Sequence, residues 1–240
     1  QTSSVFDLFW NSGWVISADP STQTKAEGIY ETQRLALKQE LKQSETLAQF
    51  SLVARSWESE FNALTPLLHL GRSEVVTDRP HSDGISNEVF DWVMENLPQA
   101  QKDLLVTNAY LIPGPEGVAM LEDLVAAGAA VTIHTNSLAS QDVAAVNSHY
   151  KAWRKPILAS GASLFEARQD AAIKQSMVDT KPVNARYMGV HSKSLVMDRR
   201  LAVIGSANLD PRSAFLNSEM IAIIDSESLA EELAQAILLD

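Results

Sequence analysis

The stretch HSKSLVMDRRLAVIGSAN, residues 191–208, contains two short apolar runs separated by three charged residues. The runs, 193–197 and 201–204, have the length and composition of β-strands, and the three residues between them suit a tight turn. The stretch therefore predicts an antiparallel hairpin. Side chains two residues apart on a strand point to the same face, so we expect His191 and Lys193 to project together.

Outside this hairpin, helical patterns and short apolar runs alternate from about residue 86 onwards, which is typical of an α/β layer fold. The pattern predicts strands at 103–107, 131–134, 163–166 and 220–224, and helices at 86–97, 116–127, 140–159 and 228–238. Helices of this length between strands favour parallel crossovers. We therefore expect an α/β fold with a mixed, largely parallel sheet and helices on both faces.

Residues 1–80 have a different pattern. A long polar helix is predicted at 25–50, and a second helix at 57–70 is interrupted at Pro66, because proline breaks or kinks a helix. This region shows no compact core of its own. We predict a mainly helical linker or tail over 1–80, followed by a catalytic half-domain over 81–240.

The composition excludes several classes of protein. The chain has 240 residues, of which 45% are hydrophobic, so it can form a sizeable core. Its formal net charge of -11 argues against a general nucleic-acid binder, which needs surplus Lys and Arg. The absence of cysteine excludes disulfides and thiolate metal sites, and no apolar run approaches the ~20 residues that span a bilayer.

Residues 171–200 are basic in this acidic chain: six Lys and Arg against two Asp give a local charge of +4. Within this region an imidazole, His191, can attack phosphorus or protonate a leaving oxygen, and an ammonium, Lys193, can hold phosphate oxygens. Gly205 would let backbone amides approach an anion, and Ser206 and Asn208 add neutral donors. This chemistry suits a phosphodiester.

The pattern H-x-K-x4-D-x6-G-S-x-N, which runs from His191 to Asn208, resembles the HKD motif of the phospholipase D superfamily at every position. The segments 208–220 and Thr135–Leu138 are similar to those of bacterial cardiolipin synthases. Enzymes of this superfamily combine two HKD motifs, one from each half of the fold, in a single active site. This sequence contains one such motif, and residues 6–12 resemble the stretch that follows the first motif in long bacterial members. The resemblance thus implies a missing first half before Gln1.

The resemblance also implies roles for individual residues. The histidine of the missing half would be the nucleophile that forms a phosphohistidine, and His191 would be the general acid and later the base. Asp198 would orient the imidazoles, and Glu219 would hold His191. The expected site thus has catalytic residues, substrate-binding residues and supporting residues: His191, Lys193 and Asp198; Ser206 and Asn208; Gly205 and Glu219. The remaining histidines lack metal-ligand spacing and are interpreted as structural or surface residues: His69, His81, His134 and His149.

The resemblance to this subgroup implies a phosphatidyltransferase of the cardiolipin synthase type, with a phospholipid substrate and neither metal nor organic cofactor. We expect peripheral attachment to a bacterial cell membrane, on a side that the sequence does not indicate. The isolated chain should be inactive, and the uncovered face of its missing half could lead to self-association. Two alternatives stay open: a single-motif nuclease or phosphodiesterase that pairs two copies, and a non-catalytic fragment that folds or binds a partner.

Overall fold

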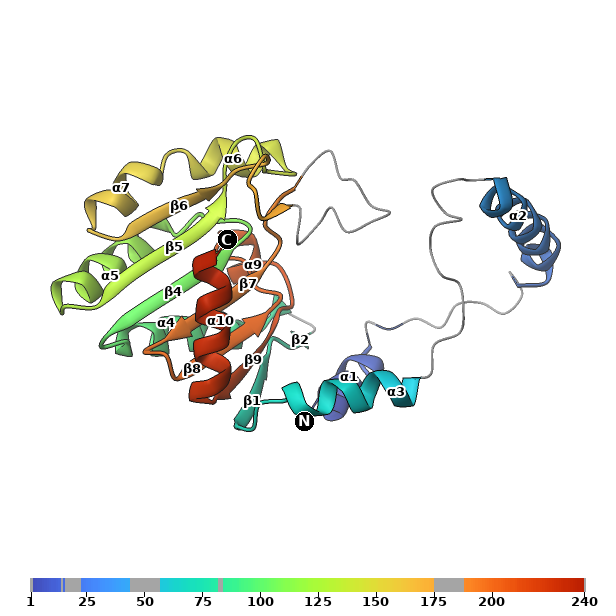
Figure 1. The fold of residues 1–240 in the computed structure, drawn as a ribbon, viewed down its shortest axis with the longest axis horizontal. Coiled ribbons are helices and arrows are strands. Elements are labelled where there is room, and N and C mark those ends of the chain that lie inside the picture. Colours follow the sequence, from blue (N-terminus) through green and yellow to red (C-terminus); the bar gives the residue numbers. More distant parts are fainter. Residues whose placement is uncertain are drawn as a thin grey trace.

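The computed structural model describes residues 2–13, 15, 23–43, 57–81, 84–174 and 188–239 (Figure 1). Its centre is a seven-stranded sheet with the order β1-β9-β8-β7-β4-β5-β6. The strands are β1 (Arg72–Thr77), β4 (Asp103–Asn108), β5 (Ala130–Asn136), β6 (Ser163–Ala167), β7 (Lys193–Met197), β8 (Leu201–Gly205) and β9 (Met220–Asp225). A separate short hairpin pairs β2 (Pro80–His81) with β3 (Gly84–Ile85).

The directions of the strands divide the sheet into two parts. The β4–β5 and β5–β6 pairs are parallel, and the other four pairs of the sheet are antiparallel. The α/β class and the mixed sheet are therefore confirmed, but the parallel pairs are a minority rather than the majority that we expected. The reason is the connections: β7, β8 and β9 follow one another without a long crossover helix.

The predicted hairpin is confirmed as β7 and β8. Its turn spans Met197 to Arg200, where the amide of Arg200 donates to the carbonyl of Met197 at 3.0 Å. Both central residues, Asp198 and Arg199, have positive φ values of 52° and 53°. This conformation matches the type I′ turns that join twisted strands, and aspartate adopts it more readily than most residues.

Helices cover both faces of the sheet, as predicted. On one face lie α4 (Glu88–Asn96), α5 (Gly114–Ala126), α6 (Ala144–Tyr150) and α7 (Arg154–Ala159), which enclose the larger hydrophobic core. On the other face α10 (Glu227–Leu239) packs Ala230, Ala234 and Ile237 on the central strands (Figure 1). The single helix expected at 140–159 is thus two shorter helices.

The N-terminal region is mainly helical, as predicted, with α1 (Thr2–Trp10), α2 (Gln23–Gln43), and α3 (Trp57–Leu64) followed by a 3-10 turn at Thr65–Leu67. Residues 44–50 of the predicted helix lie outside the described residues. The expected domain boundary at 80 is wrong, because β1 pairs along its whole length with β9 and so belongs to the sheet. Among the described helices, none is long and apolar enough to cross a membrane.

Candidate active site

One edge of the sheet collects most of the expected site residues. The register places the carboxyl ends of β4, β5, β6 and β8 beside the amino ends of β7 and β9. In open α/β sheets, ligands bind outside the carboxyl ends of the parallel strands. The following residues lie at this edge or directly beyond it: His191, Lys193, Gly205, Ser206, Asn208 and Glu219. We call it the site edge.

His191 and Lys193 lie at the start of β7. The strand begins at Lys193, and His191 precedes it. The two side chains therefore do not share one face of a strand, contrary to what we had expected. Instead, the Lys193 ammonium turns back and donates to the main-chain carbonyl of His191 at 2.7 Å. The His191 side chain is exposed, and Lys193 is half-buried. The imidazole is therefore open to a substrate, and the ammonium is held at the main chain of the same residue.

The surroundings of Lys193 adjust its charge. Burial lowers the pKa of the ammonium, and the nearby carboxylates of Asp142, Glu219 and Asp210 oppose this shift without cancelling it. The Lys193 ammonium lies 5.9 Å from the centre of the Tyr110 ring, whose hydroxyl donates to both carboxylate oxygens of Asp142 at 3.1 Å. The cation thus has an aromatic neighbour and several negative charges in its vicinity. A bound phosphate would form a direct ion pair with the Lys193 ammonium.

A buried asparagine, Asn136, at the end of β5 holds the backbone of the residue that precedes His191. Its amide nitrogen donates to the carbonyl of Val190 at 2.8 Å, and its amide oxygen accepts from the amide of Val190 at 2.8 Å. Both backbone groups of the residue before His191 are therefore bonded to one side chain that is 1% exposed. The only signal in the sequence was its place in the Thr135–Leu138 segment, and no role was assigned to it.

A second buried asparagine, Asn108, has the same function for the loop after β8. Its amide nitrogen donates to the carbonyl of Ala207 at 3.3 Å, and its oxygen accepts from the amide of Leu209 at 3.1 Å. These two residues flank Asn208. This role could not be predicted from the sequence, since an Asn at the end of a strand is equally typical of a turn.

Glu219 and Ser206 form a linked pair beside Lys193. The Glu219 side chain is buried, and its carboxylate accepts from the Ser206 hydroxyl and, at 2.9 Å, from the Asn217 amide. Within the described chain its hydrogen bonds thus support Ser206 and Asn217 rather than His191, contrary to our expectation. The Ser206 hydroxyl is also bonded to the amide of Met220 at 3.0 Å, so its orientation is fixed from two sides.

The structure gives Gly205 a packing reason. A β-carbon at Gly205 would lie 2.2 Å from the carbonyl oxygen of Met220 and 2.8 Å from a side-chain carbon of Ile221. The glycine therefore allows β9 to approach β8 closely where the two strands enter the site edge. Close packing of the two strands is thus enough to explain a glycine at this position. The role that we expected, a close approach of its backbone to an anion, is not needed for that explanation.

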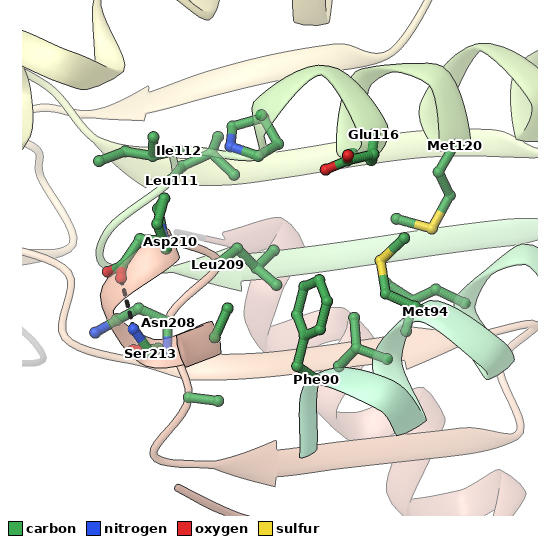
Figure 2. Close-up of a pocket in the computed structure, with 18 of the residues that line it drawn as sticks. Phe90, Met94, Leu111, Ile112, Glu116, Met120, Asn208, Leu209, Asp210 and Ser213 are labelled. Atoms are coloured by element: carbon green, nitrogen blue, oxygen red, sulfur yellow. Dashed lines mark hydrogen bonds between the residues drawn. The ribbon is translucent and has the colours of Figure 1, made fainter. Parts of the chain in front are cut away.

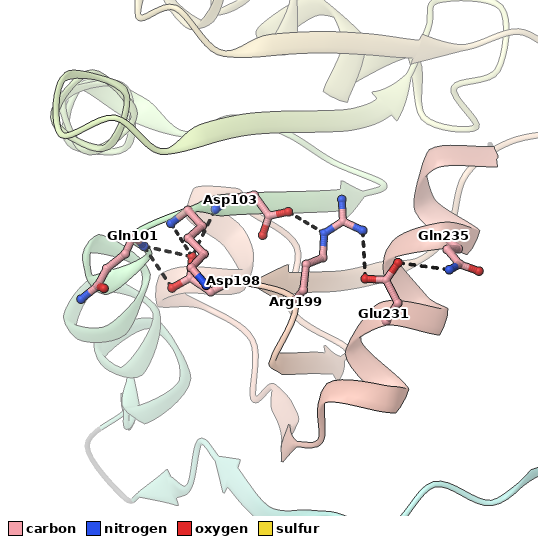
Figure 3. Close-up of polar contacts among 7 residues, drawn as sticks. Gln101, Asp103, Asp198, Arg199, Glu231 and Gln235 are labelled. Atoms are coloured by element: carbon pink, nitrogen blue, oxygen red, sulfur yellow. Dashed lines mark hydrogen bonds and ion pairs between the residues drawn. The ribbon is translucent and has the colours of Figure 1, made fainter.

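Asp198 lies at the other end of β7, and the expected role in orienting the imidazoles is wrong. Its carboxylate accepts from the amides of Gln101 at 3.0 Å, Lys102 at 2.6 Å and Asp103 at 3.1 Å (Figure 3). A five-residue strand is roughly 16 Å long, which separates Asp198 from the site edge. Burial favours a higher pKa for Asp198, but the three amide donors outweigh it and the pKa lies below its ordinary value.

The same turn is also attached to its neighbours through Arg199. The guanidinium donates to Asp103 at 2.5 Å and to Glu231 of α10 at 3.4 Å (Figure 3). Asp198 and Arg199 thus bind the turn to β4 and to α10 by different contacts. The aspartate of the motif is therefore a structural residue that fixes the start of β4 against the hairpin.

Two cavities open near the site edge. His191 borders a cavity of about 200 Å³, which His134 and Arg168 also line. Asn208 borders a second, more apolar cavity of about 280 Å³ between α4 and α5 (Figure 2). The structure therefore brings His191, Lys193 and Asn208 to the same edge but not into a single cavity. In the part of the chain that is described, no three His, Asp or Glu side chains gather in a way that would hold a metal ion.

This fold, with a histidine, a lysine and an asparagine at the site edge, defines a domain of the phospholipase D superfamily. Residues 93–238 match the family model described as "Cardiolipin synthase, PLD-like domain", which is more than half of the chain. The chain belongs to this family of phospholipase D-like domains.

Individual relatives agree with this assignment. Cardiolipin synthase C of Escherichia coli is 36% identical over 143 residues, which are 56% of this chain and 30% of that protein. Cardiolipin synthase A of Proteus mirabilis is 27% identical over 135 residues, 56% of this chain and 24% of that protein. The chain thus spans less than a third of the length of these relatives. Among solved structures, NucT from Helicobacter pylori has the same fold, with a TM-score of 0.51 and 12% identity over 70% of this chain and 94% of that one.

Proposed function

We propose that this chain supplies one half of a phosphatidyltransferase site of the cardiolipin synthase type. The observation that carries the proposal is the convergence of His191, Lys193 and Asn208 at the site edge, with two buried asparagines fixing the segments beside them. The family match supports phosphodiester chemistry on lipids. No metal or organic cofactor is part of the proposal.

In this mechanism Lys193 binds the non-bridging oxygens of the phosphodiester and stabilises the negative charge that develops in the transition state. The exposed imidazole of His191 donates a proton to the leaving alcohol, and then accepts one from the incoming alcohol. A second imidazole attacks phosphorus and forms the phosphohistidine. We propose that this imidazole comes from another half-domain, either joined to this one or in a second copy.

The test begins with binding, because the isolated chain is expected to have little turnover. Glycerophosphoglycerol, a phosphodiester without acyl chains, should shift the NMR signals of the His191 ring, and Lys193→Ala should weaken its binding at least tenfold. His149→Ala is the matched control, because this exposed histidine lies on α6 outside the motif and its loss should leave the affinity unchanged. Equal affinities for the unaltered chain and Lys193→Ala would refute the assignment of the phosphate site.

Turnover then separates the possible sources of the second imidazole. Phosphatidylglycerol vesicles are mixed with the chain, and the products are analysed by mass spectrometry together with the sedimentation coefficient. Activity only in a dimer would support the two-copy alternative, and activity of a monomer that depends on His134 would show that one chain contains both imidazoles. Release of phosphatidic acid without cardiolipin would identify a hydrolase rather than a transferase.

A further inference from the structure

The cavity beside Asn208 is lined mainly by apolar side chains. Its floor consists of Leu104, Val106 and Ile133 of β4 and β5, all at most 3% exposed, so the cavity passes through the helix layer to the sheet. Met94 of α4 and Met120 of α5 face each other across it (Figure 2). Its volume of about 280 Å³ far exceeds one water molecule and lies near the lower limit of ligand pockets, ~300 Å³.

One end of the cavity is polar and adjoins the site edge. Asn208 and Asp210 line this end, and the charge of Asp210 is among those that act on the pKa of Lys193. The side-chain oxygen of Asn208 is buried and has no hydrogen-bond partner within the described chain. The wall is fixed, because the amide of Ile112 donates to the carbonyl of Leu209 at 2.7 Å. The apolar space therefore reaches the site edge at Asn208, the edge at which Lys193 lies.

The dimensions favour a linear chain over a protein helix. A helix with its side chains is about 10 Å across and rises 5.4 Å per turn, so a single turn occupies on the order of 400 Å³. A helix could lie over the mouth of the cavity but would not fit inside. Methionine side chains adapt to irregular apolar contacts, which suits a flexible hydrocarbon. Glu116, which is exposed, also lines the cavity. Its negative charge disfavours a ligand that would place a second anionic group inside the cavity, away from Lys193.

We propose that this cavity binds one fatty-acyl chain of the phospholipid whose phosphodiester lies at Lys193. The proposal rests on the proposed function of the site edge and adds the part of the substrate that the edge leaves unbound. The acyl chain enters past Asn208, whose oxygen accepts a hydrogen bond from the glycerol hydroxyl of a lysolipid, and extends between Met94 and Met120 toward the sheet. Burial of the chain then aligns the phosphodiester with His191.

The experiment uses the 240-residue chain and a series of lysophosphatidylglycerols with hexanoyl, octanoyl and decanoyl chains, below the concentrations at which they form micelles. Glycerophosphoglycerol is the probe without an acyl chain. Each buried methylene should increase the affinity by about fourfold, so each step of two methylenes should raise it by up to about sixteenfold. Isothermal titration calorimetry gives the dissociation constants.

Met120→Trp fills the cavity and should remove the dependence on chain length, while the affinity for glycerophosphoglycerol stays within twofold. Leu238→Trp is the matched control, because Leu238 is 55% exposed on α10, on the other face of the sheet, and the length dependence should persist. If Met120→Trp fails to fold by circular dichroism, Met94→Phe makes the same test with a smaller added volume.

The possible failures are distinguishable. Equal affinities for the three lysolipids, or an unchanged length dependence in the cavity variants, would overturn the acyl-chain proposal and leave the phosphate site intact. If Lys193→Ala binds the three lysolipids as tightly as the unaltered chain does, the acyl chains bind to an apolar surface unrelated to the phosphate site. That result would also overturn the acyl-chain proposal. A loss of self-association in Met120→Trp without any length dependence in the unaltered chain would identify a protein surface as the occupant instead.

Discussion

Asp198 provides the sharpest test of the structure, because the motif alone indicates a catalytic residue and the contacts indicate a structural one. Its carboxylate accepts hydrogen bonds from three backbone amides, and hydrogen bonds to charged groups are worth ~1.5–3 kcal/mol each when buried. Gln101 and Lys102 are exposed residues, so water recovers part of the loss. Alanine at φ 52° also costs about 1 kcal/mol in backbone strain.

We therefore expect Asp198→Ala to lower the free energy of unfolding by about 3–4 kcal/mol. Asp198→Asn should lower it by only about 1–2 kcal/mol, because asparagine tolerates the left-handed conformation and its amide oxygen still accepts hydrogen bonds. Urea denaturation at neutral pH, followed by circular dichroism, measures both values. Binding of glycerophosphoglycerol at low urea should remain within twofold. Full stability of Asp198→Ala combined with lost binding would refute the reasoning and restore a role at the site.

The pH dependence of the free energy of unfolding of the unaltered chain and of Asp198→Asn gives an independent check. The pKa of Asp198 is lower in the folded chain than the ordinary value of 3.8. Its contribution to stability is therefore complete above that value and is lost as the pH falls through the lowered folded pKa. The stability difference between the unaltered chain and Asp198→Asn should be constant from about pH 7 to 5 and should shrink below about pH 4. A difference that grows in acid would contradict the assigned contacts.

Three further substitutions test the supports of the fold and the site edge. Asn136→Ala should cost about 2–4 kcal/mol, because both backbone groups of Val190 lose their partner, and faster proteolysis near Val190 should accompany the lower urea midpoint. Gly205→Ala should cost about 1–3 kcal/mol or more, because its β-carbon would collide with the carbonyl of Met220, and the soluble yield and melting temperature should both fall. Arg199→Met should lower the free energy of unfolding by less than about 1 kcal/mol, because the ion pairs of Arg199 are partly exposed. A larger loss in urea denaturation would show that these ion pairs stabilise the turn more than their exposure indicates.

The strands near the motif were predicted well because each is short, apolar and bounded by turn residues. The β7–β8 hairpin followed from its two apolar runs and the charged turn between them, and β7 was predicted with its observed limits. The direction of the pairs was predicted less well, because long helices separate only the parallel strands. β1 was missed since Arg72–Thr77 has little apolar character, and its place in the sheet depends on pairing with β9.

The spacing of His191, Lys193 and Asn208 was by itself enough to indicate a phosphodiester site, because the chemistry of each side chain and their order along the chain are local properties. The tertiary structure alone decided which of the motif residues lie together at one edge of the sheet. A strand has two ends, and residues that are close in sequence, such as Lys193 and Asp198, lie at opposite edges of the sheet. Conversely, Asn108 and Asn136 are distant in sequence from the motif and reach it only because β4 and β5 end beside β7.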